Sequence, residues 1–138
     1  MLFTPTMALS TAEAQTTDSG ALGELPTWDL THIYPSADSD EYKNALKELK
    51  EVATRFAEKC KGKLAEAATK TGEYGLGAAI KEYEAFADFA GRIGSFAGLT
   101  YYSDTSNPAN GKLYGDASAL LTEAGSQTVF FTLELNRI

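Results

Sequence analysis

The sequence has very little of the side-chain chemistry on which most active sites depend. Its 138 residues contain one histidine, His32, and one cysteine, Cys60. An HExxH zinc site needs two histidines one helical turn apart, and a di-iron bundle needs Glu-x-x-His pairs on two helices. A single cysteine also excludes a disulfide within the chain and a cysteine metal cluster. We therefore assign no catalytic, cofactor-binding or metal-ligating residue to this sequence, and its substrate-binding residues are unknown.

Other catalytic motifs are missing as well. The sequence contains no GxSxG nucleophile elbow, no GxxxxGK[ST] phosphate loop and no GxGxxG run after a strand. His32 lies between two prolines, and we interpret it as a surface or packing residue. We interpret four acidic residues as solvated or capping groups: Glu82, Glu84, Asp104 and Asp116. Tyr102 follows Tyr101 beside a polar loop, where ligand contact and helix-end packing are both open and packing is the simpler interpretation.

Basic residues are absent from the first part of the chain. Residues 1–42 contain seven acidic residues and no lysine or arginine, whereas residues 43–70 contain eight basic and four acidic residues. The net charge of the whole chain is −7. This disfavours nucleic acid or an anionic membrane surface as a partner, because phosphates require Lys and Arg for neutralisation. The basic segment is either a docking face or, more simply, a solvated helix face.

Long apolar runs are also absent. No segment approaches the ~20 consecutive apolar residues that span a membrane. The N-terminus lacks the basic region of a signal peptide, and the single cysteine fits a reducing compartment. We therefore expect a cytoplasmic protein with a disordered extension over residues 1–23 and one helical domain over residues 24–138.

The apolar periodicity and the turn residues of the sequence predict an all-α fold. An extended strap with a short turn is expected over residues 25–40, pinned to the helices by Trp28, Leu30, Ile33 and Tyr34. A helix is expected over residues 38–61, because its apolar residues recur at steps of four and three. These residues are Tyr42, Leu46, Leu49, Ala53, Phe56 and Cys60. Cys60 falls on this stripe and is interpreted as a small buried hydrophobe.

A long antiparallel helical hairpin is expected to follow. Its first arm covers residues 74–103, Asn107-Pro108 marks the turn, and the second arm covers residues 108–138. Glycine inside a helix costs up to about 1 kcal/mol relative to alanine. Gly91, Gly94 and Gly98 occur at helical spacing in the first arm. We expect the close approach of another backbone to offset this cost. A flexible hinge at these glycines is the alternative.

The segment FFTLELNRI, residues 130–138, has apolar residues around most of its helical circumference. A helix that is apolar all round is normally buried on several sides. The expected hairpin and first helix supply too few neighbours for that. We therefore expect further protein to cover this helix, either downstream in the same chain or in a partner. The alternative is a small helical interaction module that docks or self-associates through this helix.

Three stretches resemble the N-terminal region of the oligoendopeptidase F family, zinc metallopeptidases related to thimet oligopeptidase. They are LPTWDLTHIYPSADSDEY (25–42), RIGSFAGLTYYSDTSNPANGKLYGD (92–116) and FFTLELNRI (130–138). The resemblance covers residues 25 to 138 and is weakest over residues 62–80. His32 departs from it, since an acidic residue is usual there.

The resemblance implies a mostly helical, two-lobed zinc metalloendopeptidase that hydrolyses short oligopeptides in a deep channel. This chain would be a truncated N-terminal piece that walls the channel and is inactive alone. The missing downstream catalytic lobe would carry the HExxH motif and a further glutamate ligand. Zinc, the cofactor of the parent enzyme, would polarise the scissile carbonyl and activate a water, with the motif glutamate as general base. No zinc ligand falls within these residues.

Overall fold

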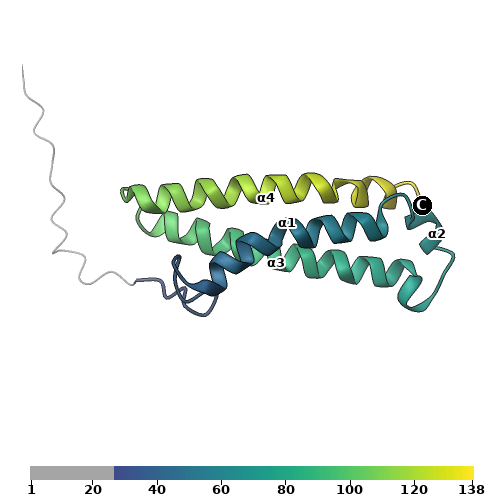
Figure 1. The fold of residues 1–138 in the computed structure, drawn as a ribbon, viewed down its shortest axis with the longest axis horizontal. Helices are drawn as coiled ribbons and strands as arrows, with labels where there is room; N and C mark the ends of the chain where they lie inside the picture. Colours follow the sequence, from purple (N-terminus) through teal and green to yellow (C-terminus); the bar gives the residue numbers. More distant parts are fainter. Residues whose placement is uncertain (1–26) are drawn as a thin grey trace, which may run out of the picture.

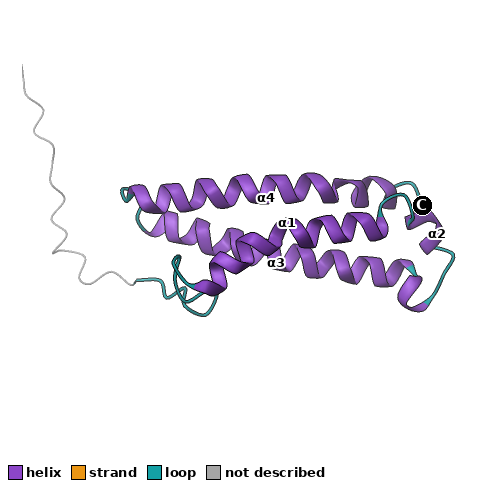
Figure 2. Cartoon of the chain, viewed as in Figure 1, coloured by secondary structure: helices purple, strands orange, loops and turns teal. Residues whose placement is uncertain are grey.

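The computed structural model describes residues 27–138. The extension expected over residues 1–23 lies outside these residues. Five helical elements follow in order, and no strand occurs among the described residues (Figure 2). They are α1 (Asp40–Cys60), α2 (Leu64–Ala67), the 3-10 helix η2 (Gly72–Tyr74), α3 (Leu76–Ser103) and α4 (Pro108–Leu135). The all-α prediction is therefore confirmed.

The three long helices lie side by side along one axis (Figure 1). α3 and α4 form the expected antiparallel hairpin. α1 packs on both and runs in the same direction as α4. The strap lies at one end of the bundle, and α2 lies at the other end with the C-terminus. We call these the strap end and the α2 end.

Local sequence signals account for the helix boundaries. Ser39 is the N-cap of α1 and its hydroxyl accepts from the Tyr42 backbone N–H, while acidic residues occupy the first turn. Gly62 follows α1 with φ +78°, a conformation that glycine adopts without strain. Asn107 caps α4 by accepting from the Ala109 N–H, and Pro108 is its first residue.

The apolar stripe predicted for α1 is confirmed, with one shift. Its buried residues are Tyr42, Ala45, Leu49, Ala53, Phe56 and Cys60. Ala45 takes the innermost position where Leu46 was expected, and Leu46 is half-buried against the same core. The two positions are neighbours on the helix, and both side chains contact the same core.

The core at the strap end is aromatic. The Tyr42 ring lies 5.0 Å from that of Tyr34 and 4.8 Å from that of Phe96. Arg92 of α3 donates to the Ile33 carbonyl at 3.2 Å, and its guanidinium lies 5.6 Å from the centre of the Tyr34 ring. Together these contacts hold the strap on α1 and α3.

The prediction that Trp28 pins the strap is wrong, since its side chain is 58% exposed. A tight turn follows it, in which Ile33 N–H donates to the Leu30 carbonyl at 2.9 Å. This turn directs Leu30 and Ile33 toward the core and buries Tyr34. Trp28 precedes the turn and lies outside it.

The prediction for the helix glycines is also wrong, because no second backbone approaches them. Nothing lies within 4 Å of a Cβ built on Gly91. At Gly94 the nearest atom is Leu121 Cδ1, at 3.1 Å, and at Gly98 it is a ring atom of Tyr114, at 3.8 Å. Only Gly94 therefore makes room for a large side chain of α4, because a Cβ at Gly98 would meet its neighbours at ordinary van der Waals distance.

The core at the α2 end contains the first two residues of FFTLELNRI. Phe131 stacks on Tyr83 with ring centres 4.4 Å apart, and Phe130 stacks on Phe56 at 5.6 Å. Phe56 is 1% exposed. α4 is therefore fixed at this end to both α1 and α3.

Candidate interaction surface

The described residues present α4 as a helix with three different faces. One face packs on the core through Ala117, Ala124, Thr128 and Phe131. A second makes polar contacts with α1 and its following loop. The third is exposed and carries no charged side chain over several turns. As expected, residues 27–138 do not cover the whole circumference of this helix, since Val129, Leu133, Leu135 and Ile138 remain exposed.

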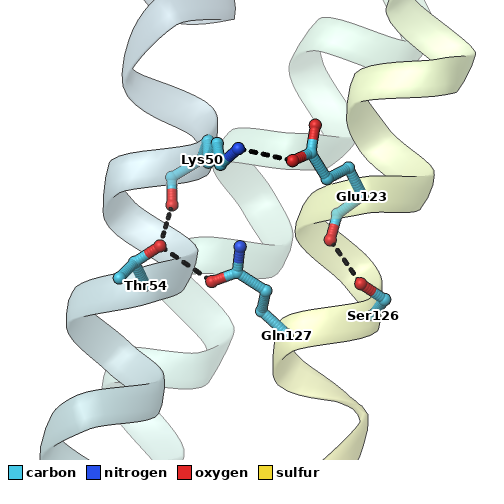
Figure 3. Close-up of polar contacts among 5 residues, drawn as sticks. All are labelled: Lys50, Thr54, Glu123, Ser126 and Gln127. Atoms are coloured by element: carbon cyan, nitrogen blue, oxygen red, sulfur yellow. Dashed lines mark hydrogen bonds and ion pairs between the residues drawn. The ribbon is translucent and has the colours of Figure 1, made fainter.

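The polar face joins α4 to α1 through paired side chains (Figure 3). Lys50 forms an ion pair with Glu123. One turn along, the Thr54 hydroxyl lies 2.9 Å from the Lys50 carbonyl and 2.7 Å from the side-chain carbonyl oxygen of Gln127. The Thr54 hydroxyl has a single proton, which it donates to the Lys50 carbonyl. The contact with Gln127 is then satisfied when the side-chain amide is rotated by 180°, so that its Nε2 donates to the Thr54 oxygen. These contacts set the register of the two parallel helices.

Glu134 closes the α2 end of this polar face. Its carboxylate accepts from the Gly62 backbone N–H at 2.7 Å and from the Leu64 N–H at 3.5 Å. These groups begin the turn and short helix after α1, where backbone N–H groups otherwise lack a partner. No local sequence pattern indicates this role, because the contact joins residues 72 positions apart.

The exposed face of α4 is an uncharged stripe, which we call the outer stripe. Its members recur at steps of four and three: Gly115, Ala119, Thr122, Ser126, Val129 and Leu133. Val129 is 57% exposed and Leu133 is 55% exposed. The outer face of α1, in contrast, is dominated by exposed charges: Lys43, Lys47, Glu48, Glu51, Arg55 and Glu58.

A second exposed apolar area lies at the end of α4, and we call it the end surface. Leu135 and Ile138 are exposed there. Ile138 lines a shallow hollow of about 300 Å³ together with Gly62, Ala65, Glu134 and Arg137. Apolar side chains next to an open hollow suit contact with another protein surface.

The residues considered as chemical candidates do not come together. His32 is exposed at a shallow hollow between the strap and α3. Glu82 pairs with Lys59, Asp116 pairs with Lys112, and the Asp104 carboxylate accepts from Ser106. Each acidic contact is local or exposed and holds helices or turns.

Tyr101 and Tyr102 differ in their surroundings. Tyr101 is half-buried and stacks on Tyr114 of α4, with ring centres 5.3 Å apart. Tyr101 therefore packs at the end of the helix. Tyr102 is exposed, and a hydrogen bond with the Tyr114 hydroxyl raises its pKa.

Cys60 is buried, as predicted, beside a partly open cavity of about 140 Å³ between α1, α2 and α3. Burial raises the pKa of its thiol. The thiolate is the reactive form of cysteine. Cys60 therefore has the environment of a structural rather than a nucleophilic cysteine.

Residues 27–138 contain no cluster of three or more His, Cys, Asp or Glu side chains able to hold a metal ion. Within the same residues, none of the helices combines the length and apolarity required to cross a bilayer. Comparisons with protein-family models, curated proteins and solved structures found no significant match.

Proposed function

We propose that this chain is a non-catalytic helical unit of a zinc metalloendopeptidase of the oligoendopeptidase F kind. In this proposal a catalytic lobe packs on the end surface, and the helices form part of the wall of a channel for short peptides. The described residues do not fit a zinc site, so zinc and the general base are assigned to the catalytic lobe. The proposal rests on the sequence resemblance together with the exposed end surface.

The observation that carries the proposal is the position of FFTLELNRI, one of the resembling stretches. Phe130 and Phe131 bury their rings in the core, and Glu134 holds the loop after α1. The same stretch leaves Leu135 and Ile138 exposed, and Ile138 lines the hollow. A segment that is fixed on one side and apolar on the other suits the junction between two packed units.

The other two resembling stretches also meet in space. Tyr34 of the strap packs against Phe96 of α3 with ring centres 5.5 Å apart, and Arg92 donates to the strap. The residues that carry the resemblance are thus contacts that hold the helices together. This agrees with a role in building the wall rather than in catalysis.

The proposal is tested on the product of the whole reading frame that contains these residues. We expect that product to carry HExxH, to bind one zinc per chain and to cleave short quenched fluorescent peptides but not folded proteins. Residues 1–138 alone are the matched control and should neither cleave peptides nor bind zinc stoichiometrically. A reading frame without HExxH, or one zinc per chain in the control, would refute the proposal.

The position of the junction is tested separately. Ile138→Asp should change the unfolding free energy of residues 1–138 by less than about 0.5 kcal/mol, because the side chain is exposed there. In the whole product it should cost at least about 1.5 kcal/mol, since it places a charge in a packed contact. Asn44→Asp on the exposed face of α1 is the control and should be neutral in both. Equal effects of Ile138→Asp in the two proteins would place the junction elsewhere.

A further inference from the structure

The cavity beside Cys60 has an apolar floor to which three helices contribute. Cys60 of α1, Leu64 of α2 and Ala79 of α3 line it, and each of them is at most 8% exposed. The volume of the cavity is about 140 Å³. An apolar cavity of about 150 Å³ holds one molecule of the size of benzene. The space above this floor therefore fits a single six-membered ring or an alkyl group of similar volume.

The loop between α2 and α3 closes one side of the cavity, and glycine is required at two of its positions. Gly72 has φ +71°, a conformation that glycine adopts without strain. At Gly75, which lines the cavity, a Cβ would lie 2.7 Å from the Lys70 carbonyl oxygen. The loop therefore closes at this point only because residue 75 has no side chain.

The mouth of the cavity is charged, and most of its charges are already neutralised. Three lysines and two glutamates line it: Lys59, Lys63, Lys70, Glu66 and Glu73. Lys59 forms an ion pair with Glu82, and Lys70 forms one with Glu66. The Glu82 carboxylate and, more weakly, Glu73 raise the pKa of Lys59. Both glutamates of the mouth therefore act on lysines of the mouth.

Lys63 differs from the other two lysines. Its ammonium donates to the Glu58 backbone carbonyl at 3.1 Å and forms no ion pair with the part of the chain that the structure describes. Its charge also acts at the floor. Burial raises the pKa of the Cys60 thiol, and the positive charges of Lys59 and Lys63 oppose this rise. Lys63 is therefore a cation beside an apolar cavity whose only partner is a neutral carbonyl.

We propose that this cavity binds a small organic acid that consists of one apolar group and one carboxylate. The apolar group occupies the space above Cys60, Leu64 and Ala79, and the carboxylate lies at the mouth beside Lys63. Apolar walls with a few polar groups that fix orientation are the usual form of a small-molecule site. The proposal is independent of the peptidase assignment and uses no residue of the end surface.

The charges at the mouth favour an anion over a cation. Glu66 is already paired with Lys70. A ligand cation reaches Glu73 only against the nearby charge of Lys59. An anion at Lys63 displaces only a contact with a neutral carbonyl. Exposed ion pairs contribute little free energy, so the floor supplies most of the affinity and Lys63 supplies the selectivity for an acid.

NMR titration of isotope-labelled residues 1–138 with benzoate tests the site. We expect saturable shift changes centred on Cys60, Leu64 and Gly75, with a Kd of roughly 1–10 mM, as suits a ligand of about nine non-hydrogen atoms. Benzylammonium has a similar ring and the opposite charge, and it should bind at least about threefold more weakly. No saturable change at these residues up to about 50 mM benzoate, or equal or tighter binding of benzylammonium, would overturn the proposal.

Substitutions that fill the cavity test its position. Ala67 also lines the cavity, and Ala67→Leu should weaken benzoate binding at least about tenfold, because the added carbons occupy the space of the ring. Ala79→Val is a second filling variant and should act in the same direction. Circular dichroism checks that each variant is folded. Unchanged benzoate affinity in a folded filling variant would refute this location.

A charge substitution tests the role of Lys63. Lys63→Gln should weaken benzoate binding about threefold, as loss of an exposed ion pair does, and should leave binding of the neutral probe benzyl alcohol unchanged. Lys47→Gln on the exposed face of α1 is the matched control and should change neither. Equal weakening of both probes by Lys63→Gln, or no effect on benzoate, would contradict the assignment of the carboxylate to Lys63.

Cys60 gives an independent measure of occupancy, because it lies in the floor and is the one cysteine of the chain. Benzoate at ten times its Kd should slow modification of the native thiol about tenfold, in proportion to the unoccupied fraction. The rate in urea should not change, because the unfolded chain has no cavity. A native rate that is unaffected by saturating benzoate would show that the ligand binds elsewhere and would overturn the proposal.

Discussion

Tyr42→Phe should stabilise the protein. Tyr42 is 0% exposed, and its hydroxyl is the one buried side-chain polar atom of the described residues that lacks a hydrogen-bond partner. The substitution removes this hydroxyl and retains the ring contacts with Tyr34 and Phe96. A buried polar group without a partner costs about 1–3 kcal/mol. The void left by one oxygen atom offsets part of that gain.

The expected net gain in unfolding free energy is therefore about 1 kcal/mol. At about 2.1 cal/mol/K per residue, unfolding of roughly 110 ordered residues has an entropy near 230 cal/mol/K, so 1 kcal/mol corresponds to about 4 °C in Tm. Thermal and urea unfolding followed by circular dichroism measure both quantities. Tyr74→Phe is the matched control, because Tyr74 is exposed and its hydroxyl is in water. A loss of 1 kcal/mol or more in Tyr42→Phe would show that the hydroxyl has a partner and that the reasoning is wrong.

Alkaline pH provides an independent check on the same residue. Burial raises the pKa of Tyr42 from its ordinary value of 10 to about 12. As pH rises from 10 to 12, the unfolded chain loses this proton before the folded chain does, so the unfolding free energy falls. The fall approaches about 2.7 kcal/mol above pH 12. Tyr42→Phe lacks this contribution, and its stability should decline less steeply than that of the unsubstituted protein between pH 10 and 12.

Three further predictions concern the α2 end. Glu134→Ala removes the acceptor for the Gly62 N–H and should cost about 1–2 kcal/mol in urea unfolding, whereas Glu134→Gln keeps an oxygen acceptor and should cost less. Equal losses would argue against the cap. Phe56→Ala should cost about 3–5 kcal/mol, because the ring is fully buried between α3 and α4, and circular dichroism should show a large fall in Tm. Cys60 should react with a thiol reagent far more slowly in the native protein than in urea, because it is buried and its pKa is raised; comparable rates would contradict that environment.

The helices could be predicted from the sequence because their signals are local and periodic. The α1 stripe, the Asn107-Pro108 turn and the burial of Cys60 depend on residues within a few helical turns. Trp28 was misplaced because its exposure is set by the turn that follows it. Gly94 was misread because the group that fills its space, Leu121, belongs to another helix.

The candidate surface could be predicted only in part. The apolar character of residues 129–138 is visible in the sequence, but which of them face the core depends on the register between α1 and α4. That register is set by contacts such as Lys50 with Glu123 and Gly62 with Glu134. These join residues more than 70 positions apart, and no periodic signal indicates them.

The parallel packing of α1 and α4 has a consequence for biosynthesis. The Phe56 ring is covered by Phe130 and Phe131, which are translated about 75 residues later. At 5–20 residues per second, roughly 4–15 seconds separate the synthesis of the two sides of this core. Helix α1 therefore leaves the ribosome with its apolar stripe uncovered on the α4 side. During that interval the nascent chain offers chaperones a binding surface that the finished fold no longer displays.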